Sequence, residues 1–369
     1  MKTSHHGLLP MTLLLLVGLL FGCGTGEDFP SPAQGGPFPS PGSDLSYQDP
    51  DDFTVTSIDL NTSFEYDGDL DEVRMFAVVK DQNGVSLEGL NRYNFTVVVE
   101  PKSAPKTVAA EDTELTLAFS DDRVVGLVID SSGSMLSPID ETRTRMQVAK
   151  EAAKLFTSLM GAGDRVAVVD FDTTTRTVQS LTDDRDAIDR EIDRMVAEGA
   201  TNLGAALAEA VRAVGTRPGK RAVILLGDGD DTMDAVQGGP EVWLNDTTGK
   251  STRLQGLNLA RNSELVVYTI GLGSDLSATG LADLQTFATE TGGTFFQATT
   301  ASALLSALGQ TIPREVDGLQ PVQTYLLQFP NRVPPVPGQS ITVPVTAIVR
   351  YRNGLRTHRD DFNDAYTVR

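Results

Sequence analysis

Between residues 123 and 314, short apolar runs alternate with segments in which apolar residues recur at helical spacing. The apolar runs have the length of strands and lie at 124–130, 165–172, 221–228 and 264–273. The segments between and after them show the period of amphipathic helices, at 146–160, 185–196, 202–214, 281–292 and 301–312. In the first of these, the predicted buried face consists of Val148, Ala152, Leu155, Phe156 and Leu159. Near-continuous apolar strands alternating with helices are typical of a mostly parallel sheet covered on both faces, so we predict a doubly wound α/β domain over residues 123–314.

Both flanks of this domain are rich in β-strand patterns instead. Residues 52–120 contain such runs at 53–60, 72–81 and 93–100, and residues 318–369 contain others at 324–329 and 340–351. Asn83-Gly84, between two apolar runs, is a hairpin signal. Flanks of about 70 and 50 residues would each bury only a marginal core. We therefore expect the two flanks to pair into one β-sandwich, with the α/β domain inserted between them.

The first 22 residues have the organisation of an export signal. Lys2 gives a positive start, and the apolar run from Thr12 to Phe21 is about half the ~20 residues that a transmembrane helix needs. The run ends in Leu20-Phe21-Gly22-Cys23, which resembles the lipobox of bacterial lipoproteins. This resemblance implies that residues 1–22 are removed and that Cys23 is acylated, which would anchor the protein to a membrane. An ordinary signal peptide with an incidental cysteine is the alternative.

The residue after the cysteine bears on which membrane this would be. In lipoproteins of two-membrane bacteria an Asp there commonly marks inner-membrane retention, whereas this chain has Gly24. We therefore expect a lipid-anchored protein of the bacterial cell envelope, at the outer membrane. Residues 23–51 are rich in Pro, Gly and Ser and are predicted to form a tether.

Composition narrows the classes of partner and site. With 30 Lys+Arg against 50 Asp+Glu, the net charge of −20 excludes nucleic acid as an expected partner, because phosphate binding relies on clustered cations. Cys23 is the only cysteine, so the body of the protein has no internal disulfide. Only three histidines occur, two of them in the first six residues, which excludes most His-rich zinc sites.

One motif follows the first predicted strand of the α/β domain, where Asp130, Ser132 and Ser134 form an Asp-x-Ser-x-Ser sequence. Here the chain resembles the von Willebrand factor type A domain, whose metal-ion-dependent adhesion site starts with this motif. The resemblance covers nearly all of 123–312 and extends to Thr201, in the loop 199–203, and to Asp228, in the loop 225–229. It implies that Asp130, Ser132, Ser134, Thr201 and Asp228 bind a metal ion. Gly227 departs from the Thr or Ser usual before that aspartate, at a position that is not a ligand.

The chemistry of these five side chains agrees with that implication. They offer only oxygen donors, which suit a hard cation such as Mg2+, with Mn2+ or Ca2+ as alternatives. Two carboxylates balance a divalent charge, and Mg2+ keeps waters that an incoming carboxylate can replace. Asp130 and Asp228 both follow strands, at the edge where doubly wound sheets bind ligands.

Other motifs in the sequence could indicate a different kind of site, but each matches its pattern less completely than the metal site does. The aspartates at 228, 230, 231 and 234 could suggest a calcium-binding loop, but the glycine and the terminal Glu of an EF-hand are absent. We therefore interpret Asp230 and Asp231 as solvated or as charge near the metal site. A Ser-His-Asp triad would need His358 to reach Ser132 or Ser134 from another domain. Asp183 or Asp184 is predicted to cap the following helix. The loop 231–253, with the only tryptophan, Trp243, is either a covering flap with Trp243 packed inward or part of a ligand surface.

We therefore predict a non-enzymatic binding protein that recognises an Asp or Glu of a protein ligand through the metal ion, in adhesion or complex assembly. The alternative is a structural or assembly protein of the envelope whose type A domain does not bind in a metal-dependent way.

Overall fold

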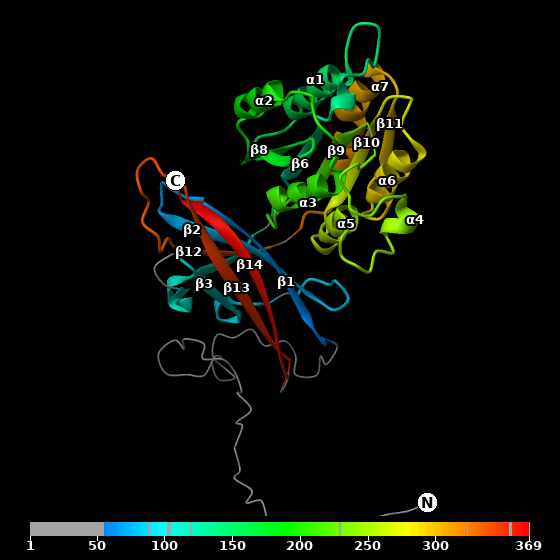
Figure 1. Cartoon of the computed structure of the whole chain (residues 1–369). Helices are drawn as coiled ribbons and strands as arrows, with labels where there is room; N and C mark the ends of the chain where they lie inside the picture. Colours follow the sequence, from blue (N-terminus) through cyan, green and yellow to red (C-terminus); the bar gives the residue numbers. More distant parts are fainter. Residues whose placement is uncertain are drawn as a thin grey trace, which may run out of the picture.

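The computed structural model describes residues 55–368, apart from residues 88, 102–104, 119, 229, 323 and 354–355. The predictions for the signal sequence 1–22, for Cys23 and for the tether 23–51 concern residues outside this range. The described chain forms a β-sandwich and an α/β domain that lie side by side (Figure 1). None of its helices is both long and apolar enough to cross a membrane.

A six-stranded sheet forms the centre of the α/β domain. Its strands are β6 (Arg123–Asp130), β7 (Arg165–Phe171), β8 (Thr175–Thr182), β9 (Lys220–Gly227), β10 (Val266–Leu272) and β11 (Phe295–Ala298). They lie in the order β11-β10-β9-β6-β7-β8. All neighbouring pairs are parallel except β7 with β8.

Helices cover both faces of this sheet. One face carries α1 (Arg145–Ser158), α2 (Arg185–Arg194), α7 (Ala301–Ser306) and α8 (Ile312–Asp317), the last two joined by a π-helical stretch, Ala307–Thr311. The other face carries α3 (Leu203–Val214), α5 (Thr252–Asn262) and α6 (Ala278–Thr289), with the short α4 (Pro240–Trp243) beside them. Because side chains alternate along a strand, β6 sends Leu127 and Ile129 into the first core and Val128 into the second.

The predicted buried face of α1 is partly wrong. Val148, Ala152 and Phe156 are buried, but Leu155 is 36% exposed and Leu159 is 44% exposed. The small residues Ala149 and Ala153 face the sheet instead and bring the helix close to it. The apolar stripe is therefore rotated away from Leu155 and Leu159.

Two four-stranded antiparallel sheets form the sandwich. The first has the order β1-β2-β12-β5, with β1 (Ile58–Asp67), β2 (Glu72–Asp81), β12 (Thr324–Pro330) and β5 (Glu114–Ala118). The second has the order β14-β13-β3-β4, with β14 (Arg356–Val368), β13 (Ile341–Asn353), β3 (Phe95–Val99) and β4 (Lys106–Val108). Each sheet combines strands from both flanks of the α/β domain, and their inner faces share one apolar core. This confirms the predicted fold class.

The chain enters the α/β domain at Asp122 and leaves it at Val322, and these two connections lie close together. The backbone of Gly219, just before β9, pairs with that of Val322, N to O at 3.2 and 2.9 Å. The next amide, Lys220 N, donates to Asp122 O at 2.8 Å, just before β6. Both connections therefore lie at the amino ends of the parallel strands. The opposite edge of the sheet, at the carboxyl ends, carries no connection to the sandwich in the part of the chain that the structure describes.

Candidate metal centre

The opposite edge of the sheet brings Asp130 and Asp228 together. Asp130 is the last residue of β6, and Asp228 follows directly after β9, its parallel neighbour in the sheet. The two carboxylates therefore stand at adjacent strand ends. Asp130 is fully buried and Asp228 is 5% exposed.

Two serines link these carboxylates through a chain of hydrogen bonds. Ser132 N donates to Asp130 Oδ1 at 2.7 Å, and Ser132 Oγ lies 2.9 Å from Ser134 Oγ. Ser134 Oγ then donates to Asp228 Oδ1 at 2.6 Å. A tight 3-10 turn, Gly133–Leu136, returns the chain after Ser132 and makes this spacing possible. Ser132 is buried, whereas Ser134 is exposed.

The loop that carries Thr201 lies against the serine motif. Gly133 N donates to Gly199 O at 3.1 Å, which joins the two loops. Thr201 is 5% exposed, and its backbone is held by the segment after β9, with Thr232 N donating to Thr201 O at 3.0 Å. Among the hydrogen bonds of the described residues, none joins the Thr201 hydroxyl to the two serines or the two aspartates. The structure therefore places Thr201 in the adjoining loop without linking it directly to the other four.

Asp130 carries the clearest sign that a cation fits here. Its Oδ2 is buried and has no hydrogen-bond partner within the described part of the chain. Burial raises the pKa of Asp130 to about 7, and the charge of Asp228 adds to this rise. A Cβ at Gly227 would lie 3.3 Å from Asp130 Oδ2, a tight contact that the glycine avoids. A buried, unsatisfied carboxylate oxygen is costly, and a bound cation would satisfy it.

Two carboxylates and three hydroxyls form an oxygen set that suits a hard cation. Across the described residues, no three His, Cys, Asp or Glu side chains come together in a way that could hold a metal ion. The hydroxyls of Ser132, Ser134 and Thr201 would therefore have to supply the remaining donors. Such a set matches Mg2+, Mn2+ or Ca2+ better than zinc.

The sequence analysis missed a guanidinium at this site. Arg145, the first residue of α1, donates from Nη1 to Asp228 Oδ2 at 2.6 Å, and its side chain is only 6% exposed. Its Nη2 pairs with the carboxylate of Asp275, in the loop after β10. No local pattern in the sequence marks Arg145 for this role, because its partners are 83 and 130 residues away.

Most of the neighbouring acidic residues have structural roles. Asp231 is 2% exposed and accepts hydrogen bonds from the backbone of Gly204, Met233 and Asp234, so the prediction that it is solvated is wrong. Asp230 bonds to the hydroxyl of Ser277. In α2 the predicted cap is confirmed, with Ala187 N donating to Asp184 Oδ1 at 3.0 Å.

His358 belongs to β14, in the sandwich. There its ring stacks on that of Tyr351, with centroids 6.4 Å apart. Ser132 and Ser134 stand at the far edge of the α/β domain, so the structure does not bring the three residues of a triad together.

The loop 231–253 folds inward as a flap. Trp243 is fully buried, packs on Phe287 and donates from Nε1 to Asp283 Oδ1 at 2.8 Å. Arg253, 1% exposed, pairs with Asp283 and with Asp234, the latter from Nε to Oδ2 at 3.0 Å. A network of buried ion pairs thus holds the loop against α5 and α6, as one of the two predicted interpretations required.

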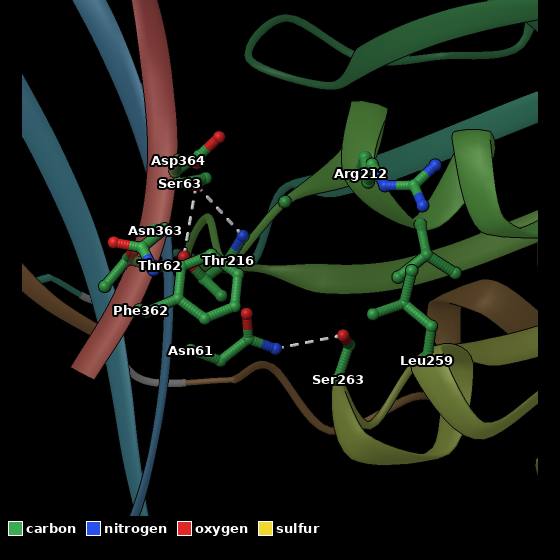
Figure 2. Close-up of a pocket in the computed structure, with 12 residues that line it drawn as sticks. Asn61, Thr62, Ser63, Arg212, Thr216, Leu259, Ser263, Phe362, Asn363 and Asp364 are labelled. Carbon is green, nitrogen blue, oxygen red and sulfur yellow. Dashed lines mark hydrogen bonds between the residues drawn. The ribbon is translucent and has the colours of Figure 1, made fainter. Parts of the chain in front are cut away.

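A second hollow lies at the junction of the two domains, away from the metal edge. The cavity has a volume of about 220 Å3. Figure 2 shows β1 and β14 on one side of it and the ends of α3 and α5 on the other. Ser63 Oγ and Thr216 Oγ1 are 3.1 Å apart across it, and Asn61 Nδ2 donates to Ser263 Oγ at 3.0 Å. These bonds join the sandwich to the α/β domain, so we regard the cavity as part of the domain junction.

Comparisons with known proteins found similarity over part of the chain. The sequence model of the von Willebrand factor type A domain matches residues 125–230. Similar solved structures include a von Willebrand factor type A protein from Catenulispora acidiphila, 16% identical with a TM-score of 0.44, covering 84% of this chain and 73% of that one. The conserved hypothetical protein BatB from Bacteroides thetaiotaomicron is 16% identical with a TM-score of 0.42. The similarity covers 52% of this chain and 98% of that one. The corresponding domain of the type V pili tip protein Mfa5 from Porphyromonas gingivalis is 17% identical with a TM-score of 0.43, covering 55% and 98%. No curated protein matches the chain in sequence.

Proposed function

We propose that the α/β domain, of which residues 125–230 match the von Willebrand factor type A domain, binds a divalent cation at the carboxyl edge of the sheet. The ligands are Asp130, Ser132, Ser134, Thr201 and Asp228, and the cation is Mg2+, with Mn2+ or Ca2+ as alternatives. The observation that carries this proposal is the buried Asp130 Oδ2, which has no donor among the described residues. A cation satisfies that oxygen and offsets the cost of burying a carboxylate there.

The bound cation gives the domain a means of recognising a protein ligand. It supplies a coordination position for a carboxylate oxygen of an Asp or Glu on the partner. Ser134 is exposed whereas Asp130 is buried, so the ligand approaches the cation from the side of Ser134. The residues at this edge bind and orient, and we assign none of them a catalytic role. The function is adhesion or complex assembly.

The proposed place of action is the bacterial cell envelope. Acylation of Cys23 anchors the protein, on the outer membrane, and residues 23–51 hold the domains away from the lipid. A Cys23→Ser variant tests this point by cell fractionation and detergent-phase partitioning. Wild-type protein is expected with the membrane and the variant in the soluble fraction, and equal partitioning of the two contradicts lipid anchoring.

The second candidate is a structural or assembly role without metal-dependent binding. One observation supports this candidate: Arg145 already pairs with Asp228, so part of the negative charge of the site is neutralised without a metal ion. Sensitivity of partner binding to EDTA separates the two candidates.

Thermal unfolding with Mg2+, Mn2+, Ca2+ or EDTA tests the metal site directly. A cation present at a hundred times its dissociation constant stabilises the protein by about 2.7 kcal/mol. We expect such a rise in melting temperature for wild type and none for Asp130→Ala. Asp230→Asn, which removes a carboxylate at the same edge from outside the ligand set, is the matched control and should keep the rise. If the wild-type protein is well folded but no cation raises its melting temperature, the structural role becomes the better-supported candidate.

A further inference from the structure

The guanidinium of Arg145 occupies a position inside the candidate metal centre. It donates from Nη1 to Asp228 Oδ2 at 2.6 Å, while Ser134 donates to the other oxygen of the same carboxylate. Both oxygens of Asp228 are therefore engaged, whereas Asp130 Oδ2 has no partner in the described chain. Of the two carboxylates proposed to bind the cation, one is already paired with a positive charge.

The surrounding loops fix the guanidinium in this place. Arg145 N donates to Ser137 O at 2.9 Å, which ties the start of α1 to the serine loop. On the other side, Gly273 has a φ of 102°, and a Cβ there would lie 2.6 Å from Arg145 Nη2 and 2.8 Å from Cζ. Only glycine allows the loop after β10 to pass so close to the guanidinium. The position of the charge is therefore built into the fold.

A second carboxylate holds the outer side of the same guanidinium. Arg145 Nη2 pairs with Asp275, whose side chain is 67% exposed, whereas the carboxylate of Asp228 is buried. Arg145 thus bridges a buried carboxylate at the metal centre and an exposed carboxylate at the surface. If Asp228 turns toward a cation, Asp275 remains as a counter-ion for the buried guanidinium.

We propose that Arg145 competes with the divalent cation for Asp228 and that Asp275 sets the strength of this competition. This inference rests on the proposed metal site. Removing the guanidinium frees Asp228 and removes a like charge from the neighbourhood of the cation, so affinity rises. Removing Asp275 leaves the guanidinium with Asp228 as its only carboxylate partner among those described, so affinity falls. The metal affinity then depends on how the guanidinium of Arg145 shares its ion pairs between the carboxylates of Asp228 and Asp275.

Isothermal titration of the full-length protein with Mn2+ and with Mg2+ tests the inference, using Arg145→Met, Asp275→Asn and the double variant. Arg145→Met should bind at least about tenfold more tightly than wild type, and Asp275→Asn several-fold more weakly. In the double variant the effect of Asp275→Asn should vanish, because Asp275 acts through Arg145. An equal loss of affinity in both backgrounds means that Asp275 acts only as a distant charge and overturns its assigned role.

If Arg145→Met does not fold, the inference can still be tested by comparing two variants that each remove one carboxylate from the surface. Asp275→Asn and Asp230→Asn each remove one carboxylate at the same edge, but only Asp275 contacts Arg145. The inference requires a clearly larger loss for Asp275→Asn, and equal losses overturn it. If wild type binds Mn2+ but neither Arg145→Met nor Asp275→Asn changes the affinity, the inference fails and the metal site stands. If wild type binds neither metal, the proposed function fails and the inference fails with it.

Discussion

Replacing Asp130 by asparagine should stabilise the cation-free protein at neutral pH, although it removes a proposed cation ligand. Burial raises the pKa of Asp130 from 3.8 to about 7, and the charge of Asp228 adds to the effect. A carboxyl group with a higher pKa in the folded chain binds its proton more tightly there than in the unfolded chain. Its contribution to stability is therefore lost as pH rises from about 4 to about 7.

The size of the effect follows from this pKa. Each pKa unit corresponds to about 1.4 kcal/mol, so a pKa of about 7 in place of 3.8 costs about 4 kcal/mol at pH 8 and less than about 2 kcal/mol at pH 5. Asparagine does not ionise, and its amide oxygen can still accept the hydrogen bond that Ser132 N donates at 2.7 Å. We expect Asp130→Asn to be more stable than wild type by up to about 4 kcal/mol at pH 8 and by less than half of that at pH 5.

Urea unfolding in EDTA at the two pH values measures this difference. Trp243 is the only tryptophan of the chain and is buried in the α/β domain, so its fluorescence follows the domain that contains the site. Asp172→Asn is a control for which we expect the opposite change in stability. Burial opposes ionisation of Asp172 too, but hydrogen bonds from Thr174 and the charge of Arg176 lower its pKa. That variant should be less stable than wild type at pH 8. If Asp130→Asn gains nothing at pH 8, or gains equally at both pH values, the buried carboxylate is not under the strain that we infer.

Three further changes test the packing. Arg253→Met leaves the buried carboxylates of Asp234 and Asp283 without their cation, and we expect urea unfolding to show a loss of about 3–5 kcal/mol; a loss below about 1 kcal/mol would mean that the ion pairs do not hold the loop. Gly204→Ala places a Cβ 2.3 Å from the backbone N of Arg253, so α3 and α5 must separate and calorimetry should show a melting temperature several degrees lower; an unchanged value would contradict the close contact. Residues 52–120 expressed alone should show no cooperative thermal transition in circular dichroism, because their strands pair with β12 and β13 of the other flank; a cooperative transition would refute the shared sandwich.

The fold could be predicted because its pattern is local. Runs such as 124–130 and 221–228 are apolar throughout, and the amphipathic segments between the strands limit the architecture to a covered parallel sheet. The shared sandwich followed from the small size of the flanks. The strand order within it was not predictable, because pairs such as β2 with β12 join residues about 250 positions apart.

Part of the site could be predicted for a related reason. In a parallel sheet the carboxyl ends of neighbouring strands meet at one edge, so two aspartates that follow two strands lie close together. Arg145 could not be found in this way, since its pairing with Asp228 and Asp275 depends on the path of three separate loops. The direction of Trp243 was open for the same reason, because its partner Asp283 comes from a helix 40 residues further along the chain.

The two connections of the inserted domain, at Asp122 and Val322, also determine how the molecule would carry mechanical load. They lie at the amino end of β6, a strand of eight residues, so about 26 Å of sheet separates them from Asp130. A force applied at Asp130 and resisted by the sandwich would run along the parallel strands and divide between two chain segments. A domain held by two such segments resists swivelling and stretching, whereas one held by a single linker turns freely. The inserted arrangement therefore makes the α/β domain a stiff element in series with the sandwich.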